Sequence, residues 1–270
     1  MAAVLANSGV SRATRILRGV LIPLVVLALW QIVTGLGWIN PIILPSPLAV
    51  VAKWWQYLKP TVTMAEGFGA WLQSSELLMD ATHSLYRVVM GFLAGTVIAL
   101  PLGLLMGTST RVYGLFNPLV QVVRPIPPIA YIPLAILWFG LGNPPAFFPV
   151  LMNTIAGVRH VDGIYLRAAR NLGANQFTIF RRVIMPAATP YILSGVRIGI
   201  GTAFIVVIVA EMIAVNNGLG YRILEAREYM WSDKIIAGML TIGLLGLVID
   251  LGMDRLNNHL LKWHRGLETK

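Results

Sequence analysis

The chain has 270 residues, of which 57% are hydrophobic and 12% are charged, and its formal net charge is +10. A typical soluble domain carries about 25% charged residues, so this composition excludes an ordinary soluble protein and predicts a polytopic membrane protein. A basic chain can also indicate nucleic-acid binding, but here the basic residues lie in clusters between apolar runs, which is typical of cytoplasmic loops. The absence of cysteine excludes disulfides, thiol catalysis and cysteine-based metal sites.

Three arginines and no acidic residue occur in the first 18 positions, at Arg12, Arg15 and Arg18. The uncharged residues 20–38 follow, and about 20 apolar residues are enough to cross a bilayer. No small-residue cleavage site ends this run. We therefore interpret it as an uncleaved first span with a cytoplasmic N-terminus rather than as a signal peptide.

Prolines at positions 41, 45 and 47 interrupt the chain after this span, and helical spacing returns over residues 48–58. This segment carries Trp54, Trp55 and Tyr57, whose side chains are typical of membrane interfaces. The pattern predicts a short helix that lies on the outer surface.

The middle of the chain contains two long apolar runs. The second span is predicted over residues 88–110, entered through an amphipathic turn that starts near Glu76. The 34 residues between Arg124 and Arg159 carry no charge, which is too many for one span and fewer than the roughly 40 that two spans need. Because both flanking basic segments are expected in the cytoplasm, an even number of crossings must separate them. We expect two crossings, with residues 140–145 as the outer turn and a short return span over residues 146–159.

The fifth span is predicted over residues 187–215, where three glycines permit close helix contact, and the last span over residues 235–256. Fifteen Lys and Arg residues fall in the segments assigned to the inside and six in those assigned to the outside. This bias predicts that both termini are cytoplasmic. No internal repeat or low-complexity linker is present, so residues 1–270 are expected to form one all-α domain with about six transmembrane helices.

A polar segment, residues 162–186, separates the fourth and fifth predicted spans. It carries Asp162 and four arginines, so it must lie in water or against a protein partner rather than in lipid. The sequence favours a first helix that ends at a left-handed Gly173 and a second helix that is capped by Asn175 and runs to Pro186. The expected structure is helix, tight turn, helix.

The spacing of this segment resembles the cytoplasmic E-A-A-x3-G-x9-I-x-L-P loop in the membrane subunits of ATP-binding cassette (ABC) importers. The matching positions are Arg167-Ala168-Ala169, Gly173 and Val183-Ile184-Met185-Pro186. Val183 and Met185 keep the apolar character of the pattern. Arg167 replaces Glu and therefore reverses a charge.

Further matches extend the resemblance over roughly residues 20–265 and are similar to the nitrate, sulfonate, taurine and bicarbonate branch of the family. They are Arg124-Pro125-Ile126-Pro127-Pro128, Trp138-Phe139-Gly140-Leu141-Gly142, Ala210-Glu211 and Trp263-His264. Relative to family members, the chain is shorter just before Phe147, around residues 142–148.

The resemblance implies a type I importer permease fold with a cytoplasmic coupling helix, placed in the bacterial inner membrane. It implies a transport subunit rather than an enzyme, paired with a second copy, with two ATPase subunits that hold ATP and Mg, and with an external substrate-binding protein. Neither a cofactor in this chain nor a nucleic-acid partner is expected. Taurine or another sulfonate is the implied substrate, with nitrate and bicarbonate also open. The residues implied to contact the ATPase are Arg167, Ala168, Ala169, Gly173, Ala174, Asn175, Gln176 and Pro186.

Motifs for catalysis are absent from the sequence. It has no G-x4-G-K-[ST] phosphate loop, no H-E-x2-H and no G-x-S-x-G elbow. The four histidines, His83, His160, His259 and His264, all fall at the ends of predicted spans. An interfacial role is therefore expected for them, and no metal site is predicted.

Polar residues within the spans are candidates for the transport pathway, because burying a charge in lipid costs a few kcal/mol or more. For Glu211 two interpretations are open: a gate or helix contact along the pathway, or a structural pair with Arg222 or Arg227. Gln121, Asn153 and Thr154 either hydrogen-bond an oxyanion or connect helices.

Two further charged groups lie at the edges of the predicted spans. His83 and Arg87 at the outer side either meet an incoming anion or pair with Asp80 or lipid headgroups. Asp250 and Asp254 are one helical turn apart near the inner boundary, and a structural ion pair is expected for them.

An ion-coupled secondary transporter or channel is the alternative function. Such a protein needs charged residues deep in the membrane to carry the coupling. The sequence-based interpretation places no charge in the middle of any span and therefore favours the importer subunit.

Overall fold

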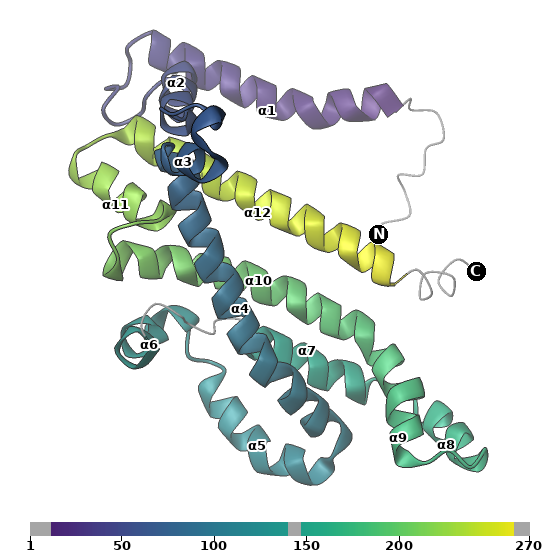
Figure 1. The fold of residues 1–270 in the computed structure, drawn as a ribbon. Coiled ribbons are helices and arrows are strands. Elements are labelled where there is room, and N and C mark those ends of the chain that lie inside the picture. The colour runs from purple at the N-terminus through teal and green to yellow at the C-terminus, as the bar shows by residue number, and fades with distance from the viewer. Residues whose placement is uncertain (1–11, 140–146, 262–270) are drawn as a thin grey trace.

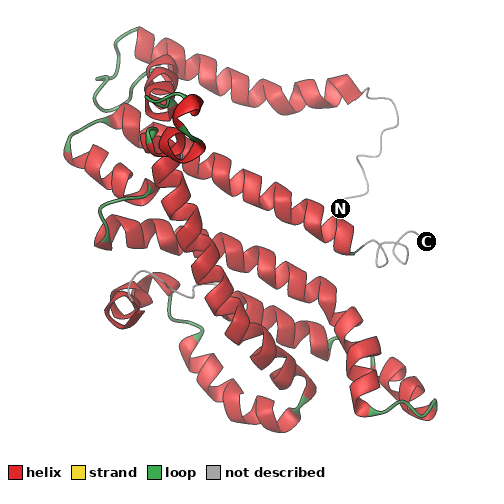
Figure 2. Cartoon of the chain, in the orientation of Figure 1, coloured by secondary structure: helices red, strands yellow, loops and turns green. Residues whose placement is uncertain are grey.

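All regular structure in the described part of the chain is helical (Figures 1 and 2), which confirms the all-α prediction. The computed structural model describes residues 12–139 and 147–261. The first elements of the chain are α1 (Arg12–Gly35), α2 (Pro47–Leu58), the 3-10 turn η1 (Met64–Glu66), α3 (Phe68–Gln73) and α4 (Glu76–Thr108). The next group is α5 (Thr110–Val123), the 3-10 turn η2 (Pro128–Tyr131), α6 (Ile132–Phe139) and α7 (Phe147–Arg159). The last group is α8 (Gly163–Asn171), α9 (Gln176–Ile179), the π-helical turn η3 (Phe180–Ile184), α10 (Met185–Ala214), α11 (Leu219–Glu228) and α12 (Ser232–Leu260).

Three described helices are long and apolar enough to cross a membrane: Glu76–Thr108, Gln176–Ala214 and Ser232–Leu260. A shorter apolar stretch, Leu21–Gly35, belongs to α1 and falls within the predicted first span. Helices α5 and α7 have 14 and 13 residues. At 1.5 Å per residue, α7 is roughly 20 Å long, the short return helix that was predicted over residues 146–159. The predicted outer turn at residues 140–145 lies outside the described residues, as does most of the shortened region.

Two predicted helix boundaries are wrong. Helix α4 begins at Glu76, as predicted for the amphipathic turn, but it continues unbroken for 33 residues, so no separate span starts at residue 88. Its first turn is capped by Ser75, whose hydroxyl accepts a hydrogen bond from the Leu78 amide. The second helix of the polar segment does not end at Pro186 either, because Gln176–Ala214 is continuous.

Pro186 is accommodated by the π-helical turn that precedes it. Proline has no amide hydrogen and its ring displaces the carbonyl four residues earlier, which usually breaks or kinks a helix. Here the Met185 amide donates instead to the Phe180 carbonyl, five residues back. The widened turn leaves Pro186 in the first turn of α10, where a missing donor costs least.

The core of the molecule is the packing of α7 against α4 and α10. A Cβ placed on Gly103 of α4 would lie 2.7 Å from the Thr154 Cβ, and one placed on Gly157 of α7 would lie 2.6 Å from the Tyr191 Cβ. Neither glycine can be enlarged without moving a neighbouring helix, so small residues let these three backbones approach closely. Buried apolar side chains fill the spaces between them, including Ala99, Met106, Leu151, Ile155, Val158, Ala188 and Ile192.

Helix α1 is joined to the rest of the molecule through α2, and Figure 1 shows most of its length apart from the other long helices. Trp30 of α1 donates from its indole nitrogen to the Pro45 carbonyl at 3.1 Å, just before α2 begins. Most apolar side chains of α1 over residues 21–36 are exposed. Its apolar surface therefore faces away from the core described above.

Candidate functional site

A row of polar residues follows one face of the N-terminal half of α4. Asp80, Ser84 and Arg87 are spaced four and three residues apart, which places them on the same side of the helix. Asp80 and Ser84 are buried, and Arg87 is largely covered. Helices α2, α10 and α11 contact α4. We call this group, with its partners Tyr57, Glu211 and Arg222 and the turn 217–220, the outer polar cluster; here and below, outer and inner name the sides of the membrane that the sequence predicts.

Glu211 of α10 is fully buried in the outer polar cluster. Its carboxylate lies 2.6 Å from the Arg87 guanidinium and accepts a 2.8 Å hydrogen bond from the Ser84 hydroxyl. The backbone amide of Gly220 donates to the same carboxylate at 3.0 Å. Three donors thus satisfy the hydrogen bonding of a fully buried carboxylate.

The turn between α10 and α11 is held by side chains of α4. The Gly218 amide donates to the Asp80 carboxylate at 2.9 Å, and the Leu219 amide donates to the Ser84 hydroxyl at 3.0 Å. Arg87 donates to the carbonyl of Asn217 at 3.2 Å and also to its side-chain oxygen. Gly218 has φ +100°, and a Cβ placed there would lie 2.5 Å from the Glu211 carboxyl carbon. Only glycine satisfies both the backbone conformation and the contact with Glu211.

A second ion pair completes the outer polar cluster. Arg222 of α11 lies 2.8 Å from the Asp80 carboxylate and 3.0 Å from that of Glu225. The Tyr57 hydroxyl of α2 donates to Asp80 at 2.8 Å. Burial and the neighbouring charge of Asp80 raise the pKa of Tyr57 above its ordinary value. Burial opposes the charged form of Arg222, but its hydrogen bonds to Glu225 and Asp80 leave its pKa raised.

The partners of these charges differ from those predicted. Glu211 pairs with Arg87 of α4, not with Arg222 or Arg227, and Asp80 pairs with Arg222, not with Arg87. The sequence showed charges at the outer ends of the spans but not which of them face each other. Whether Glu211 acts as a gate remains a prediction.

A third ion pair joins α10 to α12, and the sequence-based interpretation missed only its cation, Arg197. Arg197 binds Asp250 through two hydrogen bonds of 2.7 and 2.6 Å and lies 3.5 Å from Asp254. The ion pair predicted for these acids exists, but its cation comes from α10 rather than from the neighbouring Arg255. The detectable signal was a single arginine within the apolar run of α10, so the expectation that no span carries a charge in its middle was wrong. Its side chain is 41% exposed, and a cleft of about 240 Å³ lies beside it.

Of the remaining pathway candidates, Gln121 and Thr154, whose side chains the structure describes, do not form one site with Glu211. Gln121 is exposed on α5. Thr154 is buried on α7, and its hydroxyl donates to the Val150 carbonyl of its own helix at 2.7 Å. Thr154 packs against Gly103, roughly 28 Å further along α4 than Ser84. The side chain of Asn153 lies outside the described part.

The polar segment at residues 162–186 forms the predicted helix, turn and helix. Asp162 caps α8 by accepting a 2.9 Å hydrogen bond from the Ile164 amide. The chain then reverses at Gly173, whose φ of +78° is the predicted left-handed conformation. Asn175 caps α9 by accepting from the Thr178 amide at 2.8 Å. We call α8, the turn and α9, together with η3, the coupling segment.

The coupling segment is largely open to solvent, and Figure 1 shows α8 and α9 projecting beyond the inner end of α10. Leu172 is 88% exposed and Phe177 is 69% exposed. Between α8 and the start of α10 lies a cleft of about 720 Å³ whose wall includes Tyr165, Ala168 and Pro186. Of the residues predicted to contact an ATPase, the exposed ones are Arg167, Ala168, Gly173, Asn175 and Gln176, and the half-buried ones are Ala169, Ala174 and Pro186.

In the part of the chain that the structure describes, no group of three or more His, Asp or Glu residues is arranged to hold a metal ion. The outer polar cluster contains two carboxylates and two guanidiniums, which neutralise each other. The cluster is therefore a charge-balanced unit that connects α4, α10, α11 and α2.

Comparison with known proteins gives consistent matches. The family profile described as "Binding-protein-dependent transport system inner membrane component" matches residues 91–265. The taurine transport system permease protein TauC of Escherichia coli (strain K12) is 34% identical over 89% of this chain and 87% of its own length. The putative aliphatic sulfonates transport permease protein SsuC of Bacillus subtilis (strain 168) is 34% identical over 93% and 89%. The nitrate import permease protein NrtB of Synechocystis sp. (strain ATCC 27184 / PCC 6803 / Kazusa) is 32% identical over 84% and 82%.

The fold also matches a solved structure. A chain of the inward-facing MetNI methionine ABC transporter aligns with a TM-score of 0.58 over 65% of this chain and 92% of that chain, at 18% identity. At 18% identity, this structural similarity is evidence for the fold but not for the function. It confirms the predicted fold of a type I ABC importer permease.

Proposed function

Because the chain belongs to the family of binding-protein-dependent transport system inner membrane components, we propose that it is the permease subunit of an ATP-driven importer for a small sulfonate such as taurine. The single observation that supports ATP coupling is the coupling segment, a capped helix-turn-helix that projects from the bundle with exposed apolar and basic side chains. The names of two relatives give taurine and aliphatic sulfonates as the substrates, and the name of the third gives nitrate. Nitrate and bicarbonate are the alternative substrates.

The proposed assembly contains two copies of this chain and two ATPase subunits, which bind ATP and Mg. An external binding protein delivers the substrate. The chain itself supplies the path and carries no catalytic residue. In the proposed orientation both termini and the coupling segment lie in the cytoplasm of a bacterial cell, and α2, α11 and the outer polar cluster lie at the opposite side of the inner membrane.

The continuous helix Gln176–Ala214 supports a mechanical link between the two sides. Its inner end carries Asn175 and the turn of the coupling segment, and its outer end carries Glu211. A rigid helix moves as one body, so a displacement imposed by an ATPase at the inner end reaches the outer polar cluster. We propose Glu211 and Arg87 as the residues that hold the outer side closed in one state of the cycle.

The test is uptake by proteoliposomes that contain the permease, its ATPase and its binding protein. We expect uptake of radiolabelled taurine that requires ATP inside the vesicle and binding protein outside, with an alkanesulfonate, nitrate and bicarbonate as competitors. A proton or sodium gradient without ATP serves as the control. Uptake driven by the gradient alone would contradict the proposal in favour of a secondary transporter. Competition by nitrate but not by the sulfonate would correct the substrate class.

A further inference from the structure

We propose that Arg167 and Arg170 of the coupling segment bind acidic side chains of the ATPase, so that the partner surface is an apolar groove with an acidic rim. The proposal rests on the proposed function, because it specifies the chemistry of a partner that the function requires. It makes Arg167, at the position where the family pattern has Glu, a determinant of which ATPase this permease accepts.

The coupling segment has an excess of positive charge that the chain does not neutralise. Residues 159–186 contain five arginines and a single acid, Asp162. The Asp162 carboxylate already caps α8. Arg159 is also engaged, because its guanidinium lies 3.4 Å from the centroid of the Tyr113 ring.

The other four arginines, Arg167, Arg170, Arg181 and Arg182, are exposed. In the described residues none of the four forms an ion pair or a side-chain hydrogen bond. Arg167 and Arg170 are three positions apart on α8, where like charges repel each other. The helix therefore keeps two adjacent cations that only an external acid can neutralise.

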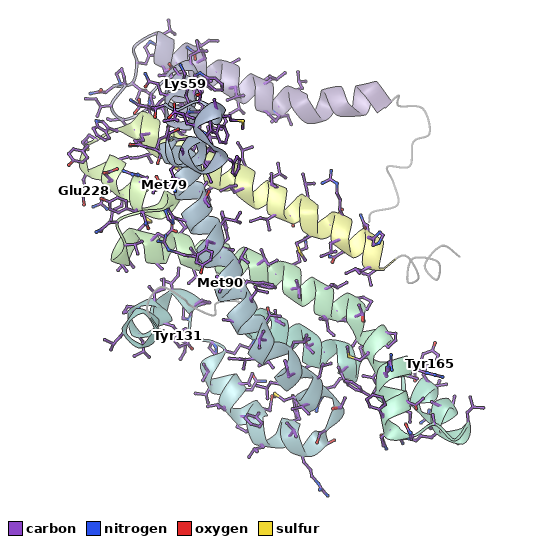
Figure 3. All side chains as sticks on the ribbon, in the orientation of Figure 1. Lys59, Met79, Met90, Tyr131, Tyr165 and Glu228 are labelled. Carbon is purple, nitrogen blue, oxygen red and sulfur yellow. The ribbon has the colours of Figure 1, made fainter. Side chains whose placement is uncertain are left out.

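Apolar side chains lie next to these cations. Leu172 and Phe177 flank the turn and are among the most exposed large apolar side chains of the chain. Tyr165, labelled in Figure 3, projects from α8 on the same segment and is also exposed. Large apolar anchors surrounded by charge are typical of a protein interface whose centre is apolar and whose rim is polar.

A basic cytoplasmic segment can also bind anionic lipid headgroups. The geometry favours a protein instead. Arg167 and Arg170 stand on α8, whose start is capped by Asp162, and Asn175 caps α9 after the turn. Both helices project beyond the inner end of α10 (Figure 1). A rigid surface with fixed charges matches a shaped groove, whereas headgroups accept charge in any arrangement.

The experiment measures the affinity of the purified ATPase subunit for the permease in nanodiscs made only of phosphatidylcholine. The variant Arg167→Glu/Arg170→Glu is compared with Arg111→Glu/Arg124→Glu, which reverses two equally exposed arginines at the ends of α5. We expect the coupling-segment variant to weaken binding by about tenfold or more, and the α5 variant to have little effect. Affinity of the unmodified pair should fall as salt rises. Replacing acids of the ATPase groove by Lys should restore binding to the Arg167→Glu/Arg170→Glu variant.

A third variant, Leu172→Ser, separates this proposal from the proposed function. If Leu172→Ser weakens ATPase binding and the charge reversal does not, the coupling segment docks the ATPase without the arginines, and this inference is wrong while the function stands. If the charge reversal matters only in discs that contain phosphatidylglycerol, the arginines bind lipid and the inference is again wrong. If the unmodified permease binds no ATPase and ATP drives no uptake, the proposed function itself fails.

Discussion

The guanidinium of Arg87 on α4 lies 2.6 Å from the carboxylate of Glu211 on α10, and the two residues are 124 positions apart in the chain. Ser84 and the Gly220 amide supply the remaining hydrogen bonds of the carboxylate. In a buried ion pair of this kind, removal of one partner leaves the other charge without compensation. The pair therefore fixes α4 to α10 at the outer side.

Glu211→Ala is expected to lower the free energy of unfolding by about 3–5 kcal/mol, because Arg87 then stays buried without its acid. Arg87→Ala should cost a similar amount, and the double variant less than the sum of both. Thermal unfolding in detergent measures the cycle. We also expect Glu211→Ala to weaken uptake while the ATPase still co-purifies, because Glu211 lies at the end of α10 opposite the coupling segment. Additive single effects would show that the pair is not coupled, and loss of ATPase assembly would argue against a gating role.

Gly218→Ala tests the packing of the turn between α10 and α11. The new Cβ would lie 2.5 Å from the Glu211 carboxyl carbon, and alanine would also have to adopt a φ of +100°. Gly67→Ala is the matched control, since its φ is +107° with no atom within 4 Å of a Cβ. Backbone strain of about 1–3 kcal/mol applies to both variants, and steric overlap adds about 1–3 kcal/mol at Gly218 alone. Equal destabilisation of the two variants would contradict the predicted contact with Glu211.

Gly173→Val is expected to uncouple ATP hydrolysis from transport. Gly173 has φ +78° with open space around it, so the variant acts through backbone strain of about 1–3 kcal/mol in the turn of the coupling segment. Gly37→Val places the same strain at φ +71°, also in open space, near the outer end of α1. We expect Gly173→Val to insert normally but to bind the ATPase poorly or to hydrolyse ATP without uptake, and Gly37→Val to transport. Unchanged binding, hydrolysis and uptake in Gly173→Val would show that this turn is not the coupling element.

The raised pKa of Tyr57 predicts a loss of stability at high pH. Burial, followed by the charge of Asp80, keeps the Tyr57 hydroxyl protonated in the folded protein above its ordinary pKa of 10.0. The unfolded chain releases this proton above pH 10, so stability is complete below pH 10 and falls as pH rises further, by up to about 1.4 kcal/mol per pH unit. Tyr57→Phe lacks this dependence. The difference in free energy of unfolding between the unmodified protein and Tyr57→Phe, measured with urea, should therefore decrease between pH 10 and 11.5. A difference that stays constant with pH would contradict the raised pKa of Tyr57.

The absence of cysteine makes membrane orientation directly testable. Trp55→Cys on α2 and Leu172→Cys on the coupling segment both introduce a thiol at an exposed position. With a membrane-impermeant maleimide we expect labelling of Trp55→Cys in intact cells and of Leu172→Cys only after permeabilisation. The opposite result would invert the proposed topology.

Local features of the fold could be predicted from the sequence because their causes are local. Asp162, Gly173 and Asn175 define the coupling segment through capping and backbone conformation, and each acts within a few residues of itself. The short helix α2 follows from Pro47 at its start and from an N-cap hydrogen bond of Ser46. The short α7 follows from a count of uncharged residues.

Long-range features were not predictable in the same way. Two ion pairs, Arg87 with Glu211 and Asp80 with Arg222, depend on the rotation of α4 about its axis. The sequence does not show this rotation. Arg197 was overlooked because its partner acids lie about fifty positions later on α12. The helix break expected at Pro186 did not occur because the preceding turn is π-helical. No residue type in the sequence predicts such a turn.

The π-helical turn η3 also sets the direction in which the coupling segment points from α10. Successive residues of an α-helix are rotated by roughly 100° about the helix axis. One extra residue in a widened turn therefore rotates all residues on one side of the turn by about 100° relative to those on the other side. The Met185 to Phe180 hydrogen bond is such a phase shift, and it lies between α10 and the coupling segment. Deleting one residue from η3 would return the helix to regular phase and swing Leu172 and the neighbouring arginines about a quarter-turn around the axis of α10. A single surplus residue therefore determines the direction in which the coupling segment points from α10.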